Sequence, residues 1–141
     1  EIYTLSLHDA LPICVSMCIC LATYVLAHFL YYFGNDRTVD GTNGLWIFAN
    51  PFTIFGLFLT AYWLIKKSAS PLFVISGSLL LIGVETFYFL TWPVPTIKEH
   101  ISPAYSFEIA HIGLYLSFIT ALGMLLFATS VRKTNRCNCK A

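Results

Sequence analysis

The sequence predicts an all-α integral membrane protein, a four-helix transmembrane bundle whose helices run alternately up and down. Composition is the first observation behind this prediction: 57% of the 141 residues are hydrophobic and 11% are charged, whereas a soluble domain is about 25% charged. The second is that the apolar residues gather in four runs, at 14–33, 45–65, 71–92 and 105–127. A helix needs about 20 such residues to cross the hydrocarbon layer. Barrel strands are only about 10 residues long, so runs of this length predict helices.

The segment before the first run, residues 1–13, resembles a translated sequencing adapter. It begins with Glu1 and lacks the basic region and small-residue cleavage site of a secretory signal. We therefore predict that residues 1–13 are non-native and that the four-helix domain covers residues 14–130. This interpretation leaves room for further helices before Cys14.

The elements follow one another with few interruptions. The second run contains no charged residue, and Pro51 within it restricts Asn50, which predicts a local kink. The third run contains one carboxylate, Glu85, and the fourth contains Glu108 and His111. The connections between runs are short, so consecutive helices are expected to be antiparallel neighbours.

The distribution of basic residues predicts the orientation of the bundle. Six of the eight Lys and Arg residues lie on one side, in the connection after the second run and in the tail at 131–141. Basic residues concentrate on the cytoplasmic side of membrane proteins. We therefore expect a short basic cytoplasmic tail, with the N-terminus on the same side because the number of spans is even.

Polar side chains within the spans are expected to form one layer. His28 and Asn50 each lie five residues from the outer end of their runs, Glu85 lies seven, and His111 lies six. At 1.5 Å per residue these positions are about 7–11 Å below the outer interface, with Glu108 slightly above them. The sequence thus predicts a buried polar cluster in the outer half of the bilayer.

Helical phase indicates which side chains share a face. Glu108, His111 and Tyr115 have i, i+3 and i+7 spacing, while Tyr24, His28 and Tyr31 form a stripe on the first span. Asn50 and Tyr115 are the residues expected to support the cluster at its edges. The first interpretation of this layer is a structural hydrogen-bond network that fixes the register of the bundle.

An alternative is acid–base or proton-coupled chemistry on a small or lipophilic substrate, in an enzyme or a carrier. Glu85, Glu108 and His111 are the candidate catalytic residues, because a carboxyl group in lipid beside an imidazole that titrates near neutrality suits proton transfer. Whether the protein is an enzyme stays open at this point.

A further alternative is a redox protein that binds haem or a single metal ion. His28 and His111 are the candidate axial ligands of a haem, and His28, Glu85, Glu108 and His111 are the candidate ligands of a metal ion. Neither cofactor is favoured over the structural network. A di-metal centre is poorly supported, because it would require a second Glu-x-x-His element. The expected partner is the lipid bilayer, with a homo-oligomer or larger membrane complex left open. A net charge of +1 argues against nucleic acid.

Overall fold

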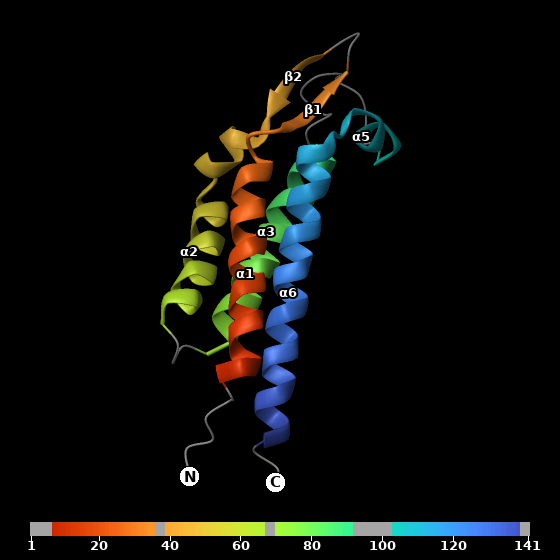
Figure 1. The fold of residues 1–141 in the computed structure, drawn as a ribbon. Coiled ribbons are helices and arrows are strands. Elements are labelled where there is room, and N and C mark those ends of the chain that lie inside the picture. Colours follow the sequence, from red (N-terminus) through yellow and green to blue (C-terminus); the bar gives the residue numbers. More distant parts are fainter. Residues whose placement is uncertain (1–6, 36–38, 67–69, 92–102, 139–141) are drawn as a thin grey trace.

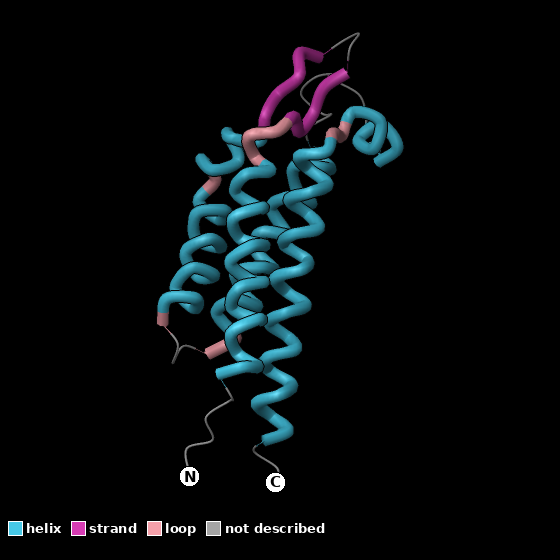
Figure 2. The backbone as a smooth tube through the Cα atoms, in the orientation of Figure 1, coloured by secondary structure: helices cyan, strands magenta, loops and turns pink. Residues whose placement is uncertain are grey.

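The computed structural model describes residues 7–35, 39–66, 70–91 and 103–138. Its long helices are α1 (Leu7–Ala27), α2 (Pro51–Ile65), α3 (Leu72–Thr91) and α6 (Ile112–Asn138), and they lie along one long axis with alternating directions (Figure 1). The short elements gather at one end of these helices (Figure 2). They are β1 (Tyr31–Asn35), β2 (Val39–Asn43), the 3-10 helix η1 (Gly44–Ala49) and α5 (Pro103–Ile109). Two basic residues on the predicted cytoplasmic side, Lys67 and Lys140, lie outside the described residues. So does the start of the adapter-like segment, residues 1–6.

The helices pack around α3, which contacts both α2 and α6, while α6 in turn packs against α1. One apolar core lies among α1, α3 and α6, and includes Met17, Leu81 and Met124. A second core, with Phe33, Ile47 and Ile109, lies toward the end that carries the β-hairpin. The fold is thus almost entirely helical, as predicted, with a small antiparallel sheet added at one end.

Two of the described helices are long and apolar enough to cross a membrane. They are α3 over Leu72–Thr91 and the part of α6 at Ile112–Val131. Two shorter apolar helices, Ile13–Ala27 and Pro51–Ile65, accompany them. The third predicted span, 71–92, thus coincides with a helix of membrane-spanning length.

The first predicted span ends earlier than expected. Residues 14–33 were predicted to be helical, but α1 ends at Ala27 and the chain enters β1 at Tyr31. The backbone carbonyl of His28 accepts a hydrogen bond from Gly44 N–H at 2.9 Å, and β1 then pairs with β2. The hydrogen-bond partner of the His28 carbonyl is thus Gly44, which lies beyond the first predicted span in sequence. At its other end α1 begins at Leu7, within the segment predicted to be non-native.

The second predicted span is divided at the position where a kink was expected. Residues 44–49 form η1, and α2 begins at Pro51. Asn50 caps α2, because its Oδ1 accepts a hydrogen bond from Phe52 N–H at 2.9 Å. Proline fits the first position of a helix, where its missing N–H has no intrahelical partner to lose.

The fourth predicted span, 105–127, is not one continuous helix. α5 ends at Ile109 and α6 begins at Ile112. Between them, His111 N–H donates to the carbonyl oxygen of Tyr32 at 2.9 Å, and Ala110 bridges to Phe33 of β1. The expected i, i+3 pairing of Glu108 with His111 on one helix is therefore wrong, because β1 takes the backbone donor that would have continued the helix.

The contact between α2 and α3 depends on small residues. A Cβ atom on Gly77 would lie 2.5 Å from Thr60 Oγ1 and 2.7 Å from the carbonyl oxygen of Gly56. We expect Gly77→Ala to lower the free energy of unfolding by about 1–3 kcal/mol, because the two helices must move apart. Thermal unfolding of the purified protein measures this change. Gly83→Ala on the same helix is the matched control, since no described atom lies within 4 Å of its new Cβ; equal melting temperatures of the two variants would contradict the prediction.

Candidate functional site

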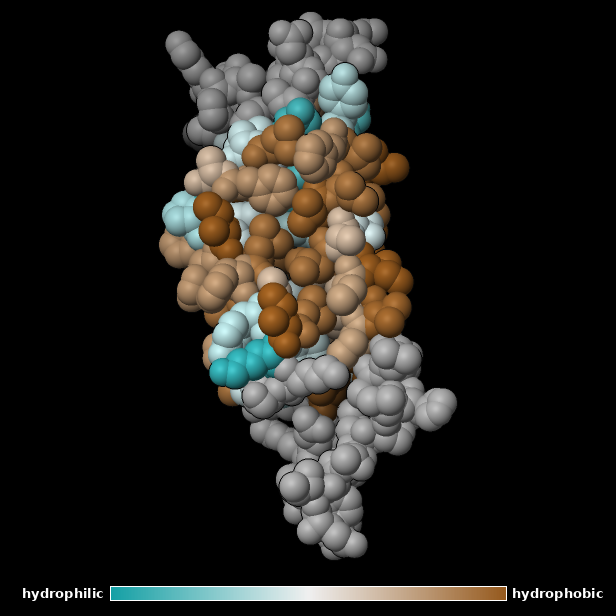
Figure 3. Space-filling view, turned by 60° about the vertical axis from the view of Figure 1, so that its left-hand side comes forward, coloured by the Kyte–Doolittle hydropathy of each residue, from teal (hydrophilic) through white to brown (hydrophobic). Residues whose placement is uncertain are grey.

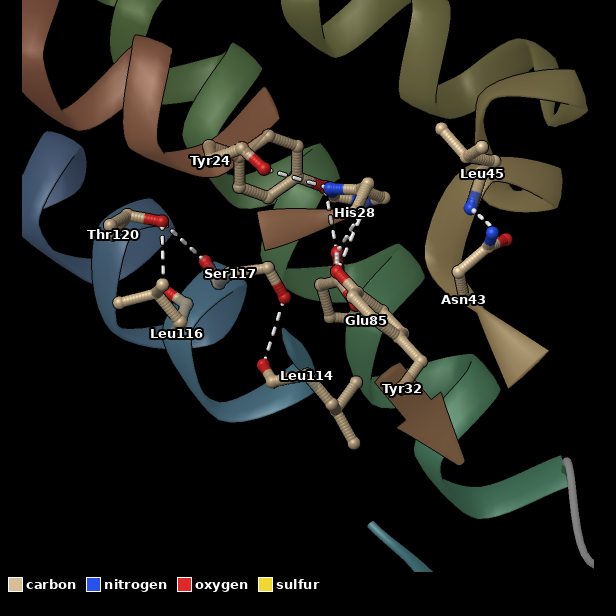
Figure 4. A network of polar contacts seen from close by, with 10 residues as sticks. All are labelled: Tyr24, His28, Tyr32, Asn43, Leu45, Glu85, Leu114, Leu116, Ser117 and Thr120. Carbon is tan, nitrogen blue, oxygen red and sulfur yellow. Dashed lines mark hydrogen bonds and ion pairs between the residues drawn. The ribbon is translucent and has the colours of Figure 1, made fainter. Parts of the chain in front are cut away.

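Four polar side chains from three elements meet in the interior of the protein. Tyr24 comes from α1, His28 from the turn after it, Tyr32 from β1 and Glu85 from α3. All four are fully buried, and Figure 4 shows them pointing toward one another. We call them the Tyr–His–Glu cluster. It connects the N-terminal helix and the β-hairpin to the central helix of the fold.

One carboxylate oxygen is the centre of the cluster. Glu85 Oε1 accepts hydrogen bonds from the hydroxyl groups of Tyr24 at 2.8 Å and Tyr32 at 3.2 Å. The same oxygen lies 3.3 Å from His28 Nε2. Charge-assisted hydrogen bonds of this kind are stronger than neutral ones. The hydroxyl groups of Tyr24 and Tyr32 therefore hold this carboxylate oxygen in one position.

The His28 imidazole is held in one orientation. Its Nδ1 lies 2.8 Å from the carbonyl oxygen of Tyr24, and a carbonyl oxygen only accepts, so Nδ1 carries a hydrogen. That carbonyl belongs to the last turn of α1, where intrahelical donors are missing. Phe48 stacks on the ring with centroids 4.5 Å apart. Nε2 is left to face both Glu85 and the hydroxyl of Tyr32, which is 3.1 Å away.

His28 Nε2 and Glu85 Oε1 lie 3.3 Å apart, and two arrangements of one proton between them fit the hydrogen bonds of the cluster. With that proton on His28 Nε2, the imidazolium donates toward Glu85 Oε1 and both tyrosines donate to the same oxygen. With the proton on Glu85 instead, His28 is neutral and Nε2 accepts from the hydroxyl of Tyr32. Both arrangements have the same net charge. The cluster can therefore hold a proton at either group without placing a net charge in the interior.

The second carboxylate oxygen, Glu85 Oε2, is buried without a hydrogen-bond partner among the described residues. A buried polar atom with no partner costs about 1–3 kcal/mol. The oxygen is therefore the position in the cluster where a proton or a further polar group would be stabilised.

The structure brings together two of the predicted cluster residues, His28 and Glu85. Asn50, expected as support, lies immediately before α2 and donates from Nδ2 to the hydroxyl of Tyr88 at 3.0 Å. It serves as a cap and a helix-to-helix contact.

The other predicted residues lie elsewhere. Glu108 and His111 are exposed, and His111 Nε2 lies 2.9 Å from the carbonyl oxygen of Gly34. Tyr115 is also exposed, and its hydroxyl donates to the carbonyl oxygen of Phe107 over a long distance of 3.5 Å. The predicted haem pair, His28 and His111, is thus divided between a buried and an exposed position. The ranges that the structure describes contain no group of three His, Cys, Asp or Glu residues that could hold a metal ion.

Sequence reasoning missed Tyr32 as a member of the cluster. The stripe on the first span was expected to continue from His28 to Tyr31, but Tyr31 is 64% exposed and Tyr32 is fully buried. Spacing of i, i+4 and i+8 from Tyr24 to His28 to Tyr32 was the available signal. It could not be preferred from the sequence, because it depends on where α1 ends.

Comparison with protein-family models, with curated proteins and with solved structures finds no match for this chain. Function must therefore come from what the cluster can do. Its burial and its contacts between distant elements suit a structural role, and the contact of an imidazole with a carboxyl group suits acid–base chemistry.

Proposed function

We propose that the chain is an integral membrane protein that crosses the bilayer four times, with both ends in the cytoplasm. Support comes from large apolar side chains that lie on the surface while ionisable side chains lie in the interior. Large apolar side chains such as Phe52, Phe58 and Ile119 are at least 60% exposed, while Glu85 and His28 are fully buried. Figure 3 shows a surface on which hydrophobic residues predominate. Soluble monomers seldom expose apolar patches of this extent.

Cysteine labelling tests the four-span topology. In a variant whose five native cysteines are replaced by serine, Asp36→Cys should react with a membrane-impermeant maleimide added to intact cells. Lys67→Cys should react only after the membrane is opened, because basic connections face the cytoplasm. Labelling of Lys67→Cys in intact cells would contradict the orientation, and release of the protein by alkaline carbonate would contradict membrane integration.

Within this bundle we propose that the Tyr–His–Glu cluster is a polar lock that holds α1 and the β-hairpin against α3. The observation that carries the proposal is Glu85 Oε1, which receives the hydroxyl groups of Tyr24 at 2.8 Å and Tyr32 at 3.2 Å. Hydrogen bonds between membrane helices contribute up to about 2 kcal/mol each. A lock of this kind would fix the register of α1, whose other contacts with α3 and α6 are apolar.

Tyr24→Phe tests the lock with the loss of one hydroxyl. We expect it to lower the free energy of unfolding by about 1–2 kcal/mol, because Glu85 loses its shorter tyrosine contact while the ring still packs. Unfolding in a graded mixture of detergents measures the change. Tyr31→Phe is the matched control, because Tyr31 is 64% exposed. Equal free energies of unfolding for Tyr24→Phe and Tyr31→Phe would contradict the polar lock.

A second candidate function is acid–base or proton-coupled activity at the same cluster. The observation that favours it is Glu85 Oε2, which is buried and has no hydrogen-bond partner within the described ranges. A proton on this oxygen would leave the Tyr24 contact to Oε1 and the His28 contact to Tyr24 O in place, while the Tyr32 hydroxyl would donate to either Oε1 or His28 Nε2. Intramembrane carboxyl groups paired with histidine are typical of proton relays. This candidate requires that Glu85 change its protonation with pH.

A further inference from the structure

The contacts between α2 and α3 define a simple antiparallel register. At one end Asn50 Nδ2 donates to the hydroxyl of Tyr88 at 3.0 Å. Further along, a Cβ atom on Gly77 would meet Thr60 Oγ1 and the backbone nitrogen of Thr60. Each step forward along α2 therefore corresponds to one step back along α3.

This register brings Thr53 opposite Glu85. Thr53 lies three residues after Asn50, and Glu85 lies three residues before Tyr88. Thr53 also shares a buried face with Gly56 and Thr60, both of which approach α3. Its side chain therefore occupies the α2–α3 interface at the level of the Tyr–His–Glu cluster.

The two residues have the same unmet requirement. Thr53 Oγ1 and Glu85 Oε2 are both buried, and neither has a hydrogen-bond partner in the part of the chain that the structure describes. Each such atom is costly to bury. Because Thr53 Oγ1 and Glu85 Oε2 lie at the same level of the α2–α3 interface, we expect them to share a hydrogen-bond partner.

We propose that Thr53 Oγ1 and Glu85 Oε2 bind one water molecule between α2 and α3. Water suits the site because it bridges polar atoms that are too far apart to bond directly, and because it needs only two to four polar partners. A cation is a poorer fit, since hard cations take about six oxygen ligands. The inference rests on the polar lock proposed above, because the contacts of Oε1 with α1 and β1 hold the Glu85 carboxylate in place.

The water would give the cluster two properties that its direct contacts lack. It would tie α2 into the lock, which otherwise joins α1, β1 and α3. It would also offer a proton donor and acceptor to Oε2, the carboxylate oxygen that receives neither tyrosine hydroxyl. Proton exchange by Glu85 would then pass through the α2–α3 interface.

Thr53→Val tests the site, because it removes the hydroxyl and keeps the shape of the side chain. If the water is bound, Glu85 Oε2 loses its bridge and the melting temperature falls by about 4 °C or more. If Thr53 Oγ1 is merely unpaired, removing it leaves the melting temperature unchanged or higher, and the proposal is overturned. Thr86→Val is the matched control, since its Oγ1 donates to Ile82 O of its own helix at 2.8 Å.

Infrared spectroscopy identifies the bridging group. Wild-type protein and Thr53→Ser should show an O–H stretching band that shifts when H2¹⁸O replaces ordinary water, and Thr53→Val should lack it. A lower melting temperature with no isotope-sensitive band lost would indicate a direct Thr53–Glu85 contact and overturn the water site. Failure of the lock is distinguishable: Tyr24→Phe would then leave stability unchanged while the band still depends on Thr53.

Discussion

Replacing Glu85 with alanine is expected to lower the free energy of unfolding by about 3–5 kcal/mol. The reason is that Tyr24, Tyr32 and His28 lose their common partner, and the Tyr24 hydroxyl is left with no acceptor. All three are fully buried, so water cannot replace the carboxylate without opening the interior. Reversible unfolding in mixed detergents, followed by tryptophan fluorescence, measures the loss.

Glu108→Ala is the matched control for this prediction. Glu108 is a carboxylate of the same type that the sequence placed in the same layer, but it is exposed on α5. Its removal should change stability by no more than about 0.5 kcal/mol. The loss of unfolding free energy in Glu85→Gln should lie between those of Glu85→Ala and Glu108→Ala, because an amide oxygen still accepts from the tyrosines. Equal losses for Glu85→Ala and Glu108→Ala would show that the cluster does not hold the fold together.

The sequence predicted the central helix and the buried pair most successfully. The run at 71–92 differs by one residue at each end from α3, Leu72–Thr91. Its apolar residues need no distant partner to form a helix, which is why hydropathy suffices. His28 and Glu85 were predicted to face the interior, and they do, because a polar side chain in an apolar helix is stabilised only next to another polar group.

The end of the fold that carries the β-hairpin could not be predicted in the same way. Residues 31–33 are aromatic and continue the hydropathy of the first span, yet they belong to β1. The break before α6 depends on Tyr32, whose carbonyl oxygen accepts the His111 N–H. Tyr32 and His111 are far apart in sequence, and the sequence pattern around Glu108 and His111 does not predict a contact with Tyr32. The structure therefore brings His28 and Glu85 together, and it places Glu108 and His111 on either side of the break at which β1 contacts the chain.

Adding Tyr24→Phe to Glu85→Leu is expected to raise stability, the opposite of its effect in the wild-type protein. In Glu85→Leu alone the Tyr24 hydroxyl is buried with no acceptor, and removing it abolishes that cost. The remaining polar groups keep their partners, because the Tyr32 hydroxyl can donate to His28 Nε2 at 3.1 Å and His28 Nδ1 to Tyr24 O at 2.8 Å. Replacing a buried ionic network with apolar residues often costs little overall. We expect the double variant to recover about 2–3 kcal/mol relative to Glu85→Leu in the same unfolding assay.

This sign reversal also separates the two proposed functions. The double variant keeps a packed interior but has no carboxyl group at position 85, so it removes the exchangeable proton while restoring the fold. If the cluster is only a lock, the double variant should match the wild-type protein in membrane insertion and in the pH dependence of its infrared spectrum. If Glu85 exchanges a proton, the wild-type protein should show a carboxyl band that responds to pH, and the double variant should lack it. A wild-type spectrum without that band would contradict the acid–base candidate and leave the lock, because the tyrosine contacts to Glu85 Oε1 stabilise the fold whether or not the proton leaves.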